Sequence, residues 1–86
     1  MFYVYVLRNE SGRFYYGFTG DLRRRFEEHQ SGESISTKGH RWHLVYYEAY
    51  AAKTDAVKRE SNLKLRSNAF TQLRRRIPES MTLKFE

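Results

Sequence analysis

The stretch from Phe14 to His29 changes its hydrophobic period at its centre, and no other feature constrains the fold as strongly. Residues 14–18 (FYYGF) are mostly aromatic, which is typical of a β-strand. Four later residues recur at the i, i+3, i+4, i+7 spacing of one helix face: Leu22, Arg25, Phe26 and His29. Between them, Thr19 or Asp21 can cap the helix. The stretch is therefore predicted to be a strand that turns directly into a helix.

A second strand precedes this unit. Residues 2–8 alternate, so that Val4 and Val6 point to one face while Tyr3, Tyr5 and Leu7 point to the other. The next four residues, Asn-Glu-Ser-Gly, are a turn signal. Residues 2–8 and 13–18 are therefore predicted to form a β-hairpin.

The length of the hairpin loop decides which tyrosines share a face. A three-residue loop with Gly12 in the left-handed conformation pairs Asn9 with Arg13 and puts Tyr5 and Tyr15 on one face. A four-residue loop would put Tyr16 with Tyr5 instead, because a one-residue slip turns the strand over. The glycine at position 12 favours the first arrangement.

The rest of the chain supplies one strand and two helices. Gly32 is expected to end the first helix, and residues 31–41 are polar and loop-like. Residues 42–49 suit a third strand. A helix over 55–66 is predicted, capped by Thr54, with Ala56, Val57, Glu60 and Leu63 on its inner side.

A last helix is predicted to start at Ser67 or Asn68 and to stop at Pro78. Its apolar stripe comprises Ala69, Phe70, Leu73 and Ile77. From Glu79 on, apolar residues alternate, which fits a short edge strand or a loosely docked end. We therefore expect an α+β fold of order β-β-α-loop-β-α-α, with a three-stranded, mainly antiparallel sheet flanked by helices. Residues 1–78 would form a single domain and 79–86 a C-terminal tail.

The positive charge of the chain is concentrated on one segment. The net charge is +6, and residues 53–76 hold eight Lys and Arg against Asp55 and Glu60, so this segment carries the whole excess. Such a segment is typical of a protein that binds phosphate backbones, or it is a solvated helix face. The chain has no cysteine, which excludes disulfides and thiolate metal sites. Its apolar runs are only strand-sized and its N-terminus suits a strand better than a signal peptide, so we expect a cytoplasmic protein without a membrane span.

Two charged residues lie on helix faces that should be apolar. Leu22 and Phe26 must be buried against the sheet, so their helix carries Arg25 and His29 inward. Glu60 is the corresponding misfit of the later helix. Because an unpaired buried charge is costly, either Arg25 and Glu60 pair with each other, or they line a cleft where one meets a phosphate and the other a cation.

The ordered set of these residues resembles the GIY-YIG nuclease domain, and most closely its small stand-alone bacterial members. The resemblance rests on Tyr3-Val4-Tyr5 in the first strand, Tyr15-Tyr16-Gly17 in the second, Arg25 and His29 on the next helix, and Glu60 on a later one. It covers residues 2 to about 66. Tyr3 stands where the family name has glycine, and Phe18 stands where some members have lysine.

The resemblance implies hydrolysis of DNA phosphodiester bonds with one divalent cation, Mg²⁺ or Mn²⁺. Tyr15, with Tyr5, would prepare the attacking water, and Arg25 would hold the scissile phosphate. Glu60 would hold the metal, and His29 would assist as a base or an acid. These roles suit the side chains, since a guanidinium matches phosphate oxygens and a hard cation prefers carboxylate and water.

Basic residues on the two helices are the candidates for DNA contacts. They are Arg23, Arg24, Lys58, Lys64 and Arg66. Two further hypotheses stay open: a catalytically silent nucleic-acid-binding or adaptor domain that keeps the nuclease fold, and an interaction module whose basic face docks an acidic protein. A domain of this size would need a dimer or a protein partner to gain specificity.

Overall fold

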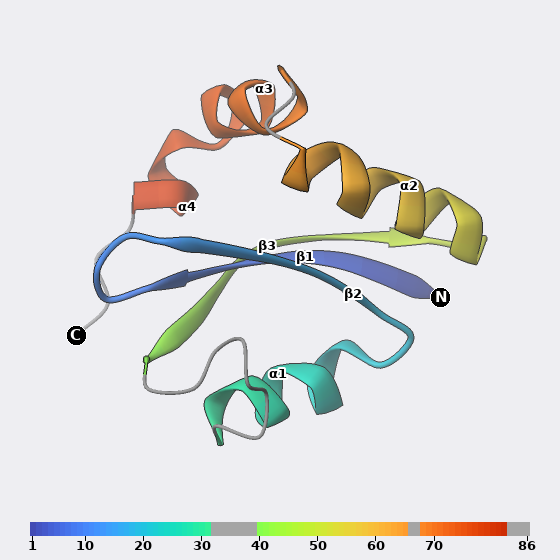
Figure 1. Cartoon of the computed structure of the whole chain (residues 1–86), viewed down its shortest axis with the longest axis horizontal. Helices are drawn as coiled ribbons and strands as arrows, with labels where there is room; N and C mark the ends of the chain where they lie inside the picture. The colour runs from blue at the N-terminus through green and yellow to red at the C-terminus, as the bar shows by residue number, and fades with distance from the viewer. Residues whose placement is uncertain (32–39, 66–67, 83–86) are drawn as a thin grey trace.

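A three-stranded antiparallel sheet separates one helix from three others. The computed structural model describes residues 1–31, 40–65 and 68–82. Its elements are β1 (Phe2–Asn9), β2 (Phe14–Thr19), α1 (Leu22–Gln30), β3 (Trp42–Tyr50), α2 (Lys53–Lys64), α3 (Asn68–Arg76) and α4 (Pro78–Thr82). The strand order is β2-β1-β3, and both neighbouring pairs are antiparallel. Figure 1 shows α1 on one side of the sheet and the other helices on the opposite side. The predicted α+β class is confirmed.

The hairpin has the predicted three-residue loop. The Asn9 amide donates to the Arg13 carbonyl over 3.0 Å, and Gly12 has a φ of 85°. In the resulting register Tyr5 pairs with Gly17, and Leu7 pairs with Tyr15. Tyr5 and Tyr15 therefore lie on one face, as the glycine in the loop predicts.

The central strand β1 supplies a buried layer to each face of the sheet. Val4 and Val6 join the core under α2, α3 and α4, which includes Leu63 and Leu73. We call this side the three-helix face. Tyr5 and Leu7 join a smaller, more aromatic cluster with Trp42 on the side of α1, which we call the α1 face. The alternation in β1 therefore sets both cores.

Helix α2 begins earlier than predicted. Its N-cap is Ala52, whose backbone is extended and which makes no side-chain cap bond, so the prediction of Thr54 as the cap is wrong. The early start brings Ala56, at 0% exposure, against the sheet. Val57 is 40% exposed instead of facing inward, because the inner face passes through Ala56 and Leu63.

The C-terminal residues that the structure describes form a helix, so the prediction of an edge strand or a loose end is wrong for them. Pro78 starts α4, consistent with the preference of proline for a first helical position. Met81 is 1% exposed and belongs to the three-helix core. The predictions for Gly32, Ser67 and residues 83–86 lie outside the described residues. Among the described helices, none has the length and apolar character needed to cross a membrane.

Candidate active site

Tyr5 is the buried centre of the candidate site. It is 1% exposed and lies in β1 directly opposite Gly17 of the edge strand β2. A Cβ atom at position 17 would overlap the Cζ and hydroxyl oxygen of Tyr5. The tyrosine ring therefore extends across the backbone of β2, and its hydroxyl reaches the edge of the sheet because position 17 has no side chain.

Helix α1 brings two predicted residues to this edge. Its N-cap is Asp21, whose carboxylate accepts from the Arg24 amide over 3.1 Å. With this start, His29 is 1% exposed and its Nε2 lies 2.9 Å from the Tyr5 hydroxyl oxygen. Arg25, one turn earlier, keeps 37% of its side chain exposed. The sequence predicts that both residues face inward. The histidine side chain is fully buried, whereas the arginine side chain is only partly buried.

The two catalytic tyrosine candidates and the histidine form one aromatic group. The ring centroids of Tyr5 and Tyr15 are 6.5 Å apart, and that of His29 is 5.7 Å from Tyr5 and 5.0 Å from Tyr15. Burial, and then the charge of Arg25, lowers the pKa of His29, while burial raises the pKa of Tyr5. Both groups are therefore neutral at neutral pH. A neutral His29 with its proton on Nδ1 can accept the Tyr5 proton through Nε2.

Arg25 faces a groove between the end of β2 and the start of α1. The groove is lined by Phe18, Thr19, Asp21, Arg24, Arg25 and Glu28. Arg25 Nη1 lies 3.2 Å from Glu28 Oε1, and hydrogen bonding to the Tyr5 hydroxyl holds the pKa of the guanidinium above its ordinary value. The group is therefore a permanent cation, open to solvent on one side and in contact with the buried tyrosine on the other.

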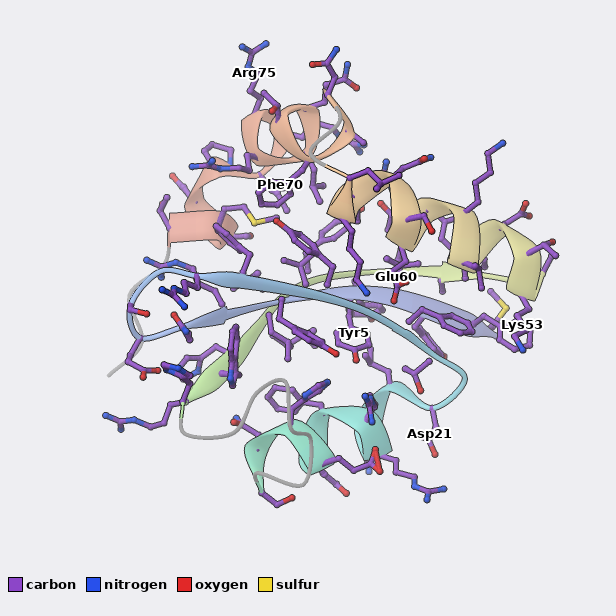
Figure 2. The ribbon with its side chains drawn as sticks, viewed as in Figure 1. Tyr5, Asp21, Lys53, Glu60, Phe70 and Arg75 are labelled. Carbon is purple, nitrogen blue, oxygen red and sulfur yellow. The ribbon has the colours of Figure 1, made fainter. Side chains whose placement is uncertain are left out.

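Glu60 approaches the same place from the other side of the sheet. It projects from α2 toward the sheet (Figure 2), and its negative charge contributes to the raised pKa of Tyr5. Its side chain is 19% exposed, and Oε1 lies 3.6 Å from Lys64 Nζ. In the described residues Arg25 pairs with Glu28, and Glu60 with Lys64. Arg25 and Glu60 thus both act on Tyr5, and each has an ion-pair partner on its own helix.

The donor set suits a hard cation held by one protein carboxylate. In the parts of the chain that the structure describes, no three His, Cys, Asp or Glu side chains gather into a metal-binding group. A cation at Glu60 would therefore complete its shell with water and substrate oxygens, as Mg²⁺ commonly does. The residues present fit such an ion.

The predicted DNA contacts lie on both sides of the site. Arg23 and Arg24 are exposed on α1, and Lys58 is exposed on α2. Lys64 is 49% exposed beside Glu60, whereas Arg66 lies outside the described residues. Lys53, the first residue of the basic segment 53–76, lies at the start of α2 (Figure 2), and its Nζ is 6.0 Å from the ring centroid of Phe18 in the groove wall. No periodicity singles out this lysine.

A second charged pair, which the sequence does not predict, lies on the three-helix face. Arg59 Nε and Nη2 reach the Glu48 carboxylate over 3.0–3.1 Å, and the Tyr46 and Tyr50 hydroxyls donate to the same group. Burial alone would raise the pKa of Glu48, but hydrogen bonds from Tyr50, Arg59 and Tyr46 lower it. The Glu48 carboxylate is thus fully hydrogen-bonded within the fold.

Comparisons with known proteins agree on one family. The sequence profile of the GIY-YIG catalytic domain matches residues 1–75. UPF0213 proteins of Staphylococcus aureus, including those of strains Mu3 and N315, are 39% identical over 64 residues, which is 72% of this chain and 78% of theirs. The solution NMR structure of a UPF0213 protein from Bacillus halodurans is 31% identical, with a TM-score of 0.55 over 100% of this chain and 98% of that one.

Proposed function

This chain belongs to the GIY-YIG catalytic domain family, whose function is of the nuclease type, and we propose that it hydrolyses DNA phosphodiester bonds with one divalent cation. One observation carries the proposal. The charges of Arg25 on α1 and of Glu60 on α2 both act on the pKa of the buried Tyr5 hydroxyl on β1, and Arg25 also lines the groove. In phosphoryl transfer a phenol can orient the attacking water, a guanidinium can stabilise the charge on the phosphate oxygens, and a carboxylate can hold a divalent cation.

The proposed division of roles follows from burial and charge. Arg25 binds the non-bridging oxygens of the scissile phosphate, because it is charged at any ordinary pH and faces the groove. The tyrosines Tyr5 and Tyr15 position the attacking water, and His29 holds the Tyr5 proton through the 2.9 Å contact. Glu60 would bind Mg²⁺ or Mn²⁺, which supplies positive charge against the phosphate and lowers the pKa of bound water.

The rival hypothesis is a domain of the same fold that binds nucleic acid without cutting it. The exposed Arg23 and Arg24 beside the groove support binding under both hypotheses. Cleavage distinguishes the two, since only the first needs Arg25 and Glu60 in their proposed roles.

The test is DNA cleavage by purified protein with Mg²⁺ or Mn²⁺, beside Arg25→Ala and Glu60→Gln. We expect each variant to lose about 100-fold or more in rate, the usual cost of a lost transition-state contact. Arg75→Ala and Glu79→Gln are matched controls, because both residues are exposed, and Figure 2 shows Arg75 pointing away from the sheet. Cleavage that both site variants retain would overturn the proposal. Salt-sensitive binding with no cleavage would establish the rival.

A further inference from the structure

The α1 face of the sheet carries two tyrosines that the proposed reaction does not use. Tyr47 lies in β3 directly opposite Tyr5, and it is 53% exposed. Its ring meets that of Tyr3 edge to face, with centroids 6.1 Å apart and planes at 60°. Of the helices that the structure describes, Figure 1 shows α1 alone on this side of the sheet. Tyr3 is half-buried, so Tyr47 presents the open ring of the pair, and an exposed tyrosine backed by a second ring can serve as a binding surface.

The two rings form the wall of a hollow beside the start of α1. Gly20, Asp21, Leu22 and Arg23 complete its lining, and its volume is about 330 Å³. Asp21 also lines the groove that contains Arg25, so the two depressions adjoin on either side of the helix start. A strand of nucleic acid held in the groove can therefore reach the tyrosine hollow within a few nucleotides.

We propose that the tyrosine hollow stacks one unpaired nucleobase of the DNA next to the cleavage site, an inference that rests on the proposed function. Stacking on an aromatic ring accepts any base, because every base has a π-face. The exposed Arg23 provides a positive charge for the adjoining phosphate. The preferred substrate is accordingly a DNA with a single-stranded end, flap or gap.

Size and charge favour a base over a protein as the occupant. A stable protein interface buries roughly 800 Å² on each partner, far more than a hollow lined by six residues offers. The chain carries a charge of +6. The resemblance noted above points the same way, since Tyr3 replaces the glycine of the motif and thereby supplies one of the two rings.

Binding in EDTA tests the inference without requiring cleavage. The probes are a blunt duplex and a duplex of equal phosphate count with a three-nucleotide overhang that contains 2-aminopurine, whose fluorescence falls on stacking. We expect the overhang duplex to bind about tenfold more tightly and its fluorescence to fall, the range expected for one stacked base. Tyr47→Ala should abolish both effects, and Tyr47→Phe, which keeps the ring, should retain them. Val57→Ala, at an exposed position of α2, is the control.

The outcomes separate this inference from the proposed function. Equal binding of the two duplexes, or a Tyr47→Ala variant that keeps the preference, overturns the tyrosine hollow while cleavage of the blunt duplex still supports the nuclease. A concentration-dependent dimer that Tyr47→Ala dissolves in sedimentation would assign the tyrosines to a second copy and overturn the inference as well. Preference for the overhang without cleavage under any cation would support the hollow and count against the nuclease.

Discussion

Arg25 and Arg59 both lie on helices that face the sheet, yet their surroundings differ. Arg59 contacts Glu48 through two guanidinium nitrogens, and two tyrosine hydroxyls donate to the same carboxylate. The two side chains of this pair are 24% and 16% exposed. Arg25 pairs with Glu28 of its own helix, through one nitrogen, and borders an open groove. The charge of Arg59 is neutralised within the fold, whereas the guanidinium of Arg25 still has nitrogens that can bind a ligand.

The position of the ion-pair partner distinguishes a charge that stabilises the fold from a charge that can bind a ligand. An arginine on a helix that forms a fully hydrogen-bonded ion pair with a carboxylate on a strand fixes the helix to that strand. A charge whose carboxylate or ammonium partner lies on its own helix gains little from that ion pair, since such pairs contribute about 0.3–0.5 kcal/mol. Glu60 resembles Arg25 in this respect, because its partner Lys64 is four residues away on α2.

The largest expected effect comes from removing the enclosed arginine. Arg59→Met should lower the free energy of unfolding by about 2–3 kcal/mol, because Glu48 then keeps its charge without a cationic partner. For a domain of this length the melting temperature should fall by roughly 10–20 °C. Arg25→Met should cost less than about 1 kcal/mol. Thermal and urea unfolding measure both, and equal losses in the two variants would remove the distinction between them.

The double variant Glu48→Gln/Arg59→Met serves as the control for this pair. We expect it to be more stable than Arg59→Met alone, since it removes the isolated charge as well. A double variant no more stable than the single one would mean that packing of the Arg59 side chain, and not its charge, fixes α2 to β3.

The second effect concerns the contact of Tyr5 with β2. Gly17→Ala should lower the free energy of unfolding by about 1–3 kcal/mol, because the new methyl overlaps the tyrosine ring. Cleavage should fall further than stability explains, since the displaced hydroxyl leaves His29. Gly20→Ala is the matched control for stability, because a Cβ there meets only Phe2 at 4.0 Å. Wild-type activity in folded Gly17→Ala would contradict a role for Tyr5.

The third effect is a pH dependence of stability that originates on the α1 face. The pKa of His29 is lowered by burial from its ordinary value of 6.5, so the unfolded chain binds the proton more tightly. The neutral imidazole therefore stabilises the fold above pH 6.5, and this contribution is lost as the pH falls below it, by at most about 1.4 kcal/mol per pH unit.

Urea unfolding between pH 5 and 8 measures this dependence, with His29→Gln as the comparison. Glutamine can still accept from the Tyr5 hydroxyl but does not titrate. We expect the difference in stability between the two proteins to change across this range, with the wild type losing more at low pH. Parallel curves would show that the titration of His29 is not linked to folding.

The sequence predicts the α1 face well because its signals are local. Gly12 determines the hairpin register, and this register puts Tyr5 beside Tyr15. The period of α1 brings His29 and Arg25 to the same edge. Tyr5, Tyr15, Arg25 and His29, the candidate site residues of the α1 face, therefore all lie within the first 29 residues of the chain.

The three-helix face is harder to predict because its contacts are distant in sequence. The pair of Arg59 with Glu48 joins α2 to β3, and the spacing of residues within either element does not say which residue of the other it meets. Pro78 is a helix stop for α3 and also the start of α4, and the burial of Met81 depends on a core assembled from other segments. Gly17 is part of a recognisable motif, but the reason for the glycine becomes visible only when the Tyr5 ring is placed over it.

The smallest expected effect tests whether Glu60 is as open as Arg25. Lys64→Gln removes its partner at 3.6 Å, and we expect the free energy of unfolding to change by less than about 0.5 kcal/mol, as for other exposed pairs four residues apart. If Lys64 also contacts a phosphate, the slope of log affinity for DNA against log salt should become shallower by about 0.9. Titrations of DNA at several salt concentrations measure this slope, with Arg75→Gln, whose side chain points away from the sheet, as the comparison. A loss of stability near that of Arg59→Met would mean that Glu60 is held within the fold as Glu48 is. Of the two charged site residues, only Arg25 would then be available to a ligand.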